Sequence, residues 1–499
     1  MRVPEIRVRV LNPAPVRRTG AYVLYWMTAS RRLHDNFALD RALELCVEFQ
    51  RPLLVFEAVR IGYQWASARL HTFILQGMAE NQLEAQEAGV GYLGYVEPEA
   101  GAGKGLLAAL ASRACAVVSD EYPCFMIPRM VQAGAAQCGV HFEAVDSNGL
   151  LPMASADRQF DLAHSFRRFL HKNLPEHLAD APSADPMKQL PAALLLPGLP
   201  ALGYESALQA LVGGGLEPWP YAKASDVLQS ELASLNLNRS VEALGETVGG
   251  AGEANYRLDQ FLARRLSRYP EERNFPEQNV TSELSPYLHF GHISAHRVFR
   301  QLADSEGWSL EKLAEKPTGR REGWWNMSQG AEAFLDQLIT WRELGFNMCW
   351  SNDSYTKYES LPQWARTTLE EHRHDTRRWV YPLARLESAS THDPLWNAAQ
   401  RQLVRTGTIH NYLRMLWGKK ILEWSASPQD ALEHMIELND KYALDGRDPN
   451  SYSGIFWVLG RYDRAWGPER PVFGKIRYMS SENTARKVDV ESYLHWFRD

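Results

Sequence analysis

The sequence of 499 residues contains few cysteines, and their spacing fits no structural framework. Only five occur, an odd number without a CxxC pair, which excludes a disulfide-stapled scaffold and a cysteine-ligated zinc site. We therefore expect a reduced, cytoplasmic protein without a metal centre.

Long apolar runs are absent as well. The most apolar stretch, residues 192–202, is interrupted by prolines and is far shorter than the ~18 residues that cross a bilayer. Residues 2–18 are rich in arginine but lack the apolar core of a secretion signal, so we interpret them as a basic arm. The sequence predicts no membrane partner.

An excess of basic charge is also missing, since the formal net charge is −6. This argues against a uniformly basic nucleic-acid-binding protein but leaves room for a local basic face. The chain is instead rich in tryptophan, with 16 residues, and arginine supplies most of its 54 basic side chains. Arginine suits fork-shaped recognition of phosphate or carboxylate, although a compositional bias would give the same excess.

Residues 20–150 alternate short apolar runs with helical patterns. One such pattern covers residues 37–49 and follows Asp35 or Asn36, where a helix cap is expected. Alternation of this kind predicts an α/β domain built on a doubly wound parallel sheet. The five predicted strands cover residues 21–27, 52–59, 91–96, 115–120 and 141–146.

The rest of the chain divides into two regions. Residues 151–255 are rich in proline and loosely patterned, which predicts an interdomain linker with short helices. Residues 256–499 show helical periodicity without a convincing strand, which predicts a larger all-helical domain.

Two glycine-rich motifs in the first domain do not indicate a nucleotide site. Gly89–Gly94 matches GxGxxG, but its glycines follow a helix and precede a strand, the reverse of the dinucleotide-binding order. Gly101–Gly105 contains a lysine but lacks the GK[ST] of a phosphate loop.

The helical region carries four ordered motif segments. The first runs from Tyr269 through the hydroxyl-rich stretch 281–291, just ahead of an amphipathic helix. Such a stretch is typical of an anion site or, on spacing alone, of a plain helix cap. The other three segments cover residues 334–344, 391–424 and 438–479.

Together these segments resemble the photolyase/cryptochrome family, most closely the class II cyclobutane pyrimidine dimer photolyases, over nearly the whole chain. The resemblance implies an antenna-type α/β domain, a helical domain holding FAD that is active in its reduced form, and light-driven repair of UV-damaged DNA. In that reaction an electron passes to a flipped pyrimidine dimer, which splits and returns it. A monomer is expected, and the α/β domain could hold a second antenna chromophore whose identity no residue decides.

The resemblance places FAD against residues from several segments. Arg414 and Asp445 match an ion pair beside the flavin, where a cation would favour the anionic reduced form. Either Asn439 or Asn450 faces flavin N5, and Asn439 is closer to the class II pattern. The implied cofactor-binding residues are Tyr269, Thr281, Ser282, Glu283, Leu284, Ser285, Arg414, Asn439, Asp445 and Asp448.

Three tryptophans match a chain that carries electrons from the surface to the flavin: Trp396, Trp417 and Trp424. The last two are seven residues apart, nearly two helical turns, and therefore share one helix face. Ordinary aromatic packing is the alternative interpretation.

The implied substrate contacts lie on the same domain. Trp341 and Trp457 match the aromatic pair that clamps the flipped dimer. The basic residues between positions 401 and 420 predict a phosphate-binding face, with a solvated helix face as the alternative. The residues assigned to substrate and DNA are Trp341, Arg342, Asn411, Met415 and Trp457.

Some positions depart from the class II pattern. Gln337, which we assign to the catalytic residues, stands where class II enzymes carry a glutamate, and its amide cannot give up a proton. Ser451 replaces a glycine, and the segment after Trp457 is one residue shorter. Gln337 keeps repair of another lesion open, such as the six-four photoproduct. A cryptochrome-like blue-light receptor without repair is the third hypothesis.

Overall fold

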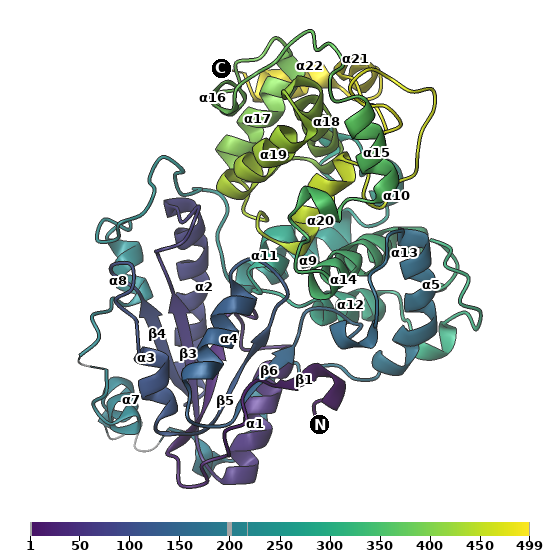
Figure 1. Ribbon diagram of the computed structural model, residues 1–499. Coiled ribbons are helices and arrows are strands. Elements are labelled where there is room, and N and C mark those ends of the chain that lie inside the picture. The colour runs from purple at the N-terminus through teal and green to yellow at the C-terminus, as the bar shows by residue number, and fades with distance from the viewer. Residues whose placement is uncertain (1, 197–201, 217, 499) are drawn as a thin grey trace. The chain divides into compact units, whose positions relative to one another are not determined.

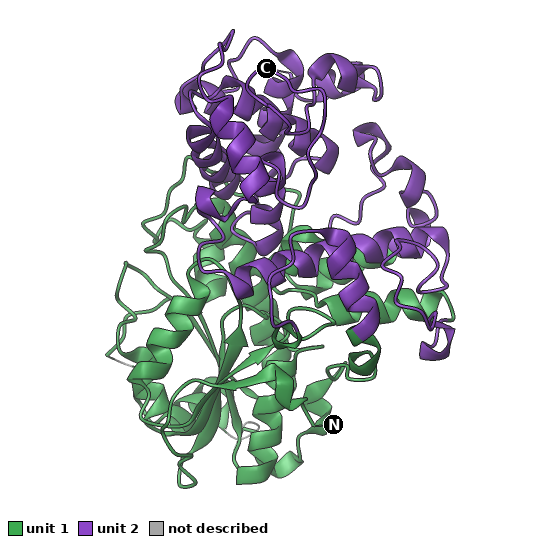
Figure 2. Cartoon of the chain, turned by 45° about the vertical axis from the view of Figure 1, so that its right-hand side comes forward, with its two compact units in different colours: residues 1–155, 173–259, 284–307 green, residues 156–172, 260–283, 308–499 purple. Residues whose placement is uncertain are grey.

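The computed structural model describes residues 2–196, 202–216 and 218–498, which form two compact units (Figure 2). The sheet unit comprises Met1–Ser155, Asn173–Asp259 and Leu284–Gly307. The helical unit comprises Ala156–Lys172, Gln260–Glu283 and Trp308–Asp499. The region expected to be a linker, residues 151–255, is thus divided, with most of it in the sheet unit.

Six strands form one sheet in the order β1-β6-β5-β2-β3-β4 (Figure 1). The neighbours from β2 to β6 pair in parallel, whereas β1 pairs antiparallel with β6 at the edge. The predicted parallel sheet is confirmed, and the three-residue β1 is too short and too exposed to give a pattern. The strands are β1 (Val8–Val10), β2 (Tyr22–Met27), β3 (Leu53–Val59), β4 (Gly91–Val96), β5 (Ala114–Glu121) and β6 (Phe142–Asp146).

Helices cover both faces of this sheet, which is why its central strands β2 and β5 are buried along their whole length (Figure 1). On one face α1 (Phe37–Phe49) packs its apolar stripe, and Asn36 caps it as expected by accepting from the N–H groups of residues 38 and 39. The other face is covered by α3 (Leu106–Ala111), α4 (Ile127–Gln137) and α7 (Tyr204–Val212).

The remaining helices of the sheet unit include α2 (Ala68–Glu87), α8 (Ala224–Gln229), α11 (Ser285–His289) and α12 (Ala295–Ser305). The chain leaves α2 through Gly89, at φ +68°, and enters β4. The GxGxxG match therefore has the reversed order expected from the sequence.

The arginine-rich N-terminus is not a free basic arm. Arg7 is only 2% exposed and donates hydrogen bonds to the carbonyl oxygens of Asp146, Gly149 and Leu150. Arg9 pairs with Glu121 at 2.6 Å. The Arg7 guanidinium can be buried at this sheet edge because both of its Nη atoms donate to carbonyl oxygens and one of them lies 3.9 Å from the Asp146 carboxylate.

The all-helical prediction for residues 256–499 is confirmed, since the described residues from 256 to 498 contain no strand, although residues 284–307 belong to the sheet unit. None of the described helices is both long and apolar enough to cross a membrane. The helices are α5 (Ala163–Asn173), α9 (Ala251–Arg264, divided between the units), α10 (Tyr269–Glu272), α13 (Gln329–Leu335), α14 (Arg342–Ser351), α15 (Gln363–Glu371), α16 (Leu383–Glu387), α17 (Pro394–Thr406), α18 (Asn411–Trp424), α19 (Pro428–Tyr442), α20 (Pro449–Val458), α21 (Ser481–Ala485) and α22 (Val490–Trp496).

Candidate functional site

Arg414 and Asp445 form the ion pair that the sequence predicts. Arg414 projects from α18, and its Nη2 lies 3.0 and 3.4 Å from the two carboxylate oxygens of Asp445, which follows α19. Both side chains are largely buried, at 18% and 15% exposure. The Nε atom of Arg414 is buried and has no hydrogen-bond partner among the described residues. A buried donor is therefore available to an acceptor on a bound ligand.

Asn439 lies in the last turn of α19 and is 2% exposed. Its Nδ2 donates to Ser451 Oγ at 2.6 Å and to Asp440 Oδ1 at 3.2 Å. No residue in the described part of the chain donates a hydrogen bond to its Oδ1. Asn450 instead starts α20, where its backbone N–H donates to the capping carboxylate of Asp448. The buried amide of Asn439 is the better candidate for a flavin contact.

These groups fit FAD. A flavin ring offers carbonyl and ring-nitrogen acceptors along one edge and, when reduced, an N–H at N5. Arg414 supplies an unused buried donor and Asn439 an unused acceptor, beside an ion pair that can compensate a charged ring. Polar groups without protein partners are expected where a ligand completes the hydrogen bonding.

The first motif segment is more dispersed. Tyr269 begins α10 and is buried, which raises the pKa of its phenol. Thr281, whose carbonyl accepts from Arg265 at 3.0 Å, lies in the helical unit together with Ser282 and Glu283. The sheet unit begins again at Leu284, which stands at the N-cap of α11 without a capping side chain. Ser285 is the first residue of that helix.

The predicted electron-transfer tryptophans are brought together in the core of the helical unit. The rings of Trp396, on α17, and Trp424, on α18, are 5.7 Å apart at 70°. Trp396 Nε1 donates to the backbone oxygen of Trp417 at 3.0 Å. All three indoles are 2% exposed or less.

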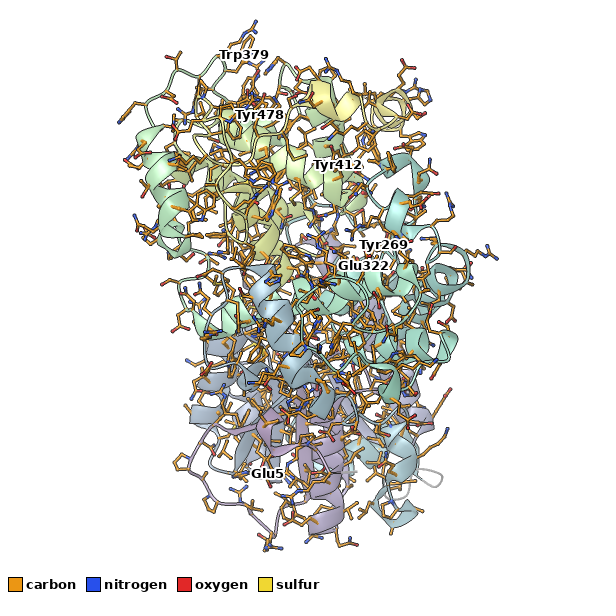
Figure 3. The ribbon with its side chains drawn as sticks, turned by 90° about the vertical axis from the view of Figure 1, so that its right-hand side faces the viewer. Glu5, Tyr269, Glu322, Trp379, Tyr412 and Tyr478 are labelled. Carbon is orange, nitrogen blue, oxygen red and sulfur yellow. The ribbon has the colours of Figure 1, made fainter. Side chains whose placement is uncertain are left out.

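The aromatic series continues from Trp424 toward solvent. His392 lies 5.0 Å and Tyr381 5.6 Å from the Trp424 ring, measured between centroids. Trp379 stacks on His392 at 4.8 Å and is 40% exposed, and Figure 3 labels it. The order of these residues connects the buried indoles to the surface.

Gln337 and Trp341 both belong to a π-helical turn, Asp336–Trp341. Such turns are rare and concentrate at functional sites, because the extra residue re-aims neighbouring side chains. The turn is anchored by Asp336, whose carboxylate accepts from Nε of the buried Arg167 at 2.8 Å. Arg342, which follows it, is buried with its guanidinium 4.4 Å from the Phe346 ring centre.

Trp341 and Trp457 share a cavity of about 870 Å³ in the helical unit. Five arginines and two carboxylates line it, so its wall carries an excess of positive charge in a chain whose net charge is −6. Arg320 and Arg321 are exposed and make no side-chain ion pair within the described chain. The lining residues are Leu162, Ala163, His164, Arg167, Gly319, Arg320, Arg321, Glu322, Trp341, Trp457, Tyr462, Asp463, Arg464 and Arg477.

A second cavity of about 430 Å³ shares Trp457 and Arg477 with the first and includes Met415. Its other aromatic residues are Tyr412, Trp466 and Tyr478, and Figure 3 labels the two tyrosines. Four aromatic rings with Arg470, Arg477 and Lys487, and no carboxylate among the lining residues, suit bases and phosphates.

Trp457 is held from behind by Lys419. Lys419 is 1% exposed, its Nζ donates to Val458 O at 2.6 Å, and it lies 4.9 Å from the Trp457 ring centre. Burial lowers the pKa of Lys419 to about 7. The Lys419 side chain therefore packs against an aromatic residue that lines both cavities rather than facing solvent.

The basic segment at positions 401–420 does not form the expected phosphate-binding face. Lys419 and Lys420 are buried, Arg414 is paired with Asp445, and Arg401 donates to the backbone oxygen of residue 497. Exposed cations that line the cavities come instead from segments 320–321 and 464–470, while Arg405 is exposed within the basic segment. The dense arginines of these two segments were the available sequence signal. Asn411 is exposed at the start of α18.

Comparison with known proteins agrees with this architecture. Residues 23–190 match the family model for DNA photolyase. Over 493 residues the chain is 33% identical to a deoxyribodipyrimidine photo-lyase of Methanothermobacter thermautotrophicus, covering 99% of this chain and 98% of that one. The deoxyribodipyrimidine photo-lyase of Oryza sativa is 34% identical over 505 residues, covering 99% and 90%.

Solved structures share the fold. A photolyase from Sulfolobus tokodaii with two FAD molecules superimposes with a TM-score of 0.63 at 16% identity, covering 96% of this chain and 90% of that one. The sheet and helical units are therefore those of the photolyase/cryptochrome fold. The chain belongs to the DNA photolyase family, and it is an enzyme of the deoxyribodipyrimidine photo-lyase class. Membership implies FAD as cofactor and UV-damaged DNA as partner.

Proposed function

We propose that this enzyme repairs cyclobutane pyrimidine dimers by light-driven electron transfer from reduced FAD, in the manner of class II photolyases. The observation that carries the proposal is the shared cavity of Trp341 and Trp457. These are the residues expected to clamp a flipped dimer, and they come from elements more than 100 positions apart. Core packing alone would not leave both on one open, positively charged cavity.

Different residues of the cavities would contact the dimer and the DNA backbone. Trp341 and Trp457 would hold the dimer between aromatic faces, with Met415 at the second cavity that Trp457 borders. The exposed Arg320 and Arg321 would contact backbone phosphates, which adds affinity without base specificity. Extrusion favours a dimer because its distorted bases stack weakly in the duplex.

The cofactor would be held by Arg414, Asp445 and Asn439, with Tyr269 and residues 281–283 of the same unit as further contacts. FAD supplies, when bound and reduced, the electron that an excited flavin can donate. Arg414 would favour the anionic reduced form by Coulomb attraction in a site of low dielectric. Trp396, Trp417 and Trp424 would relay electrons from a reductant in solution to an oxidised cofactor, and each indole that gives an electron to its neighbour would receive one in turn.

Gln337 would contact the dimer through its amide. The residue lies on the π-helical turn beside Trp341, and its amide offers one donor and one acceptor face. Neutral hydrogen bonds can orient the base edges, but no proton is available to a developing charge. We therefore expect this enzyme to repair cyclobutane dimers with a lower yield than an enzyme with glutamate at this position.

A repair assay with defined lesions tests the proposal. Duplexes carrying one cyclobutane dimer or one six-four photoproduct are incubated with the reduced holoenzyme under blue light and in darkness. We expect light-dependent restoration of the cyclobutane duplex alone. Restoration of the six-four duplex would reassign the substrate, and no light-dependent repair of either would contradict an enzyme role.

A second chromophore and the oligomeric state belong to the same proposal. The S. tokodaii photolyase contains two FAD molecules, which implicate a novel light-harvesting cofactor there. We propose a monomer whose sheet unit has room for a second, antenna chromophore of unassigned identity. The absorption spectrum of the purified protein, read with its mass in solution, tests both points.

A further inference from the structure

Ser451 and Asn439 are joined by a short buried hydrogen bond. Asn439 lies in the last turn of α19, Ser451 stands in the first turn of α20, and both residues are at most 5% exposed. Nδ2 of Asn439 lies 2.6 Å from Ser451 Oγ. A glycine at position 451, as in the class II pattern, has no hydroxyl and cannot make this bond.

Asp440 fixes which end of the Asn439 amide faces these oxygens. The Oδ1 atom of Asp440 accepts the backbone N–H of Arg447 at 2.8 Å, and its Oδ2 accepts the hydroxyl of Tyr452 at 3.0 Å. A carboxylate surrounded by donors acts as an acceptor toward the amide 3.2 Å away. The nitrogen of Asn439 must therefore point toward Asp440 and Ser451.

The amide oxygen of Asn439 is left for a ligand. Two oxygens engage Nδ2, while no described residue donates to Oδ1. We propose that Ser451 is a positioning residue that turns the amide oxygen of Asn439, rather than its nitrogen, toward bound FAD. This inference rests on the proposed function, because it requires FAD beside Asn439.

An oxygen at this place has a definite electronic effect. Reduced flavin carries a hydrogen on N5 and can donate to the amide oxygen, whereas oxidised flavin presents only a lone pair there. An acceptor consequently stabilises the reduced form, and a donor would stabilise the oxidised form. Loss of the Ser451 hydroxyl removes one of the two bonds that hold the favourable orientation, so the reduction potential should fall.

The test compares Ser451→Ala with Ser451→Gly. Both variants lose the hydroxyl, but alanine favours the first turn of α20 and glycine disfavours it, so their thermal stabilities differ. We expect both to lower the midpoint potential of bound FAD alike, by about fivefold in the two-electron equilibrium between oxidised and reduced flavin, or ~20 mV at about 30 mV per tenfold. Ser451→Thr keeps the hydroxyl and should retain the wild-type potential.

A double variant shows whether Ser451 acts through Asn439. In an Asn439→Ala background, Ser451→Ala should change the potential no further. The assignment would be overturned if Ser451→Ala shifted the potential equally in that background, or if neither single variant shifted it. It would also be overturned if the potentials of the two single variants differed in step with their thermal stabilities. In each of these cases FAD binding would remain intact. Wild-type protein that retains no FAD would overturn this assignment together with the proposed function, and its absorption spectrum reports that outcome separately.

Discussion

Removing the negative charge of Asp445 should make the proposed flavin site more electropositive. In the structure the carboxylate neutralises Arg414 across 3.0 Å, with both side chains mostly buried. At an effective dielectric constant of about 20, the gross attraction across that distance is about 5 kcal/mol. Asn at this position still accepts a hydrogen bond, and the partial exposure of the pair screens the charge, so we expect a net loss of about 1–3 kcal/mol in the free energy of unfolding.

The same change should raise the midpoint potential of bound FAD. With Asp445→Asn, the charge of Arg414 is no longer compensated and attracts an anionic reduced flavin more strongly. A difference of about 1.4 kcal/mol corresponds to a tenfold change in the equilibrium and to about 30 mV for the two-electron couple of oxidised and reduced flavin. The assay is a spectroscopic redox titration of the holoenzyme.

A matched control separates charge from stability. Glu387 pairs with Lys441 at 2.6 Å, at a comparable exposure and in the same unit. Glu387→Gln should lower stability to a similar extent without moving the potential. An unchanged or lowered potential in Asp445→Asn, or an equal rise in the control, would refute the assignment of Arg414 and Asp445 to the flavin.

Three further predictions concern electron supply, the lesion and pH. Trp396→Phe should slow photoreduction of oxidised FAD by more than an order of magnitude while pre-reduced enzyme still repairs, whereas Trp324→Phe, in a separate aromatic cluster, should leave photoreduction intact. Gln337→Glu should raise the repair yield of cyclobutane dimers in a blue-light assay, and a drop would indicate another lesion. Burial lowers the pKa of His171 to about 4, so between about pH 6.5 and 4 the unfolded chain binds more protons, and stability should fall over this range by up to about 3 kcal/mol. Thermal melts at a series of pH values should show this fall. It should be shallower in His171→Phe, which keeps a ring against Trp324. Equal slopes in the two proteins would refute the assignment of this pH dependence to His171.

The sequence predicted elements whose pattern is local. β4 has the predicted bounds Gly91–Val96, and α1 begins where Asn36 was expected to cap it, because strand apolarity and capping chemistry are properties of neighbouring residues. The edge strand β1 was not predicted, because three residues are too few to show a hydrophobic period. The burial of Arg7 was not predicted either, since it depends on carbonyl groups about 140 positions away in the sequence.

The candidate site shows the same division. The Arg414–Asp445 pair and the indole series could be predicted because long motifs carry them. The positive cavity wall could not, because Arg320 and Arg464 come from separate segments and only the fold brings them to one space. Conversely, the sequence led us to expect Lys419 among the phosphate contacts, whereas in the structure its side chain is buried against Trp457. The bond from Ser451 to Asn439 likewise depends on how α19 and α20 pack.

The central claim is light-driven splitting of cyclobutane dimers by reduced FAD. The most direct measurement quantifies, by chromatography, the thymines restored from a duplex with a single dimer after blue-light exposure of the reduced holoenzyme. We expect restoration in the light, none in darkness, and a loss of both dimer binding and restoration in Trp457→Ala. Restoration that is independent of light, or its absence from FAD-loaded and fully reduced enzyme, would contradict the account.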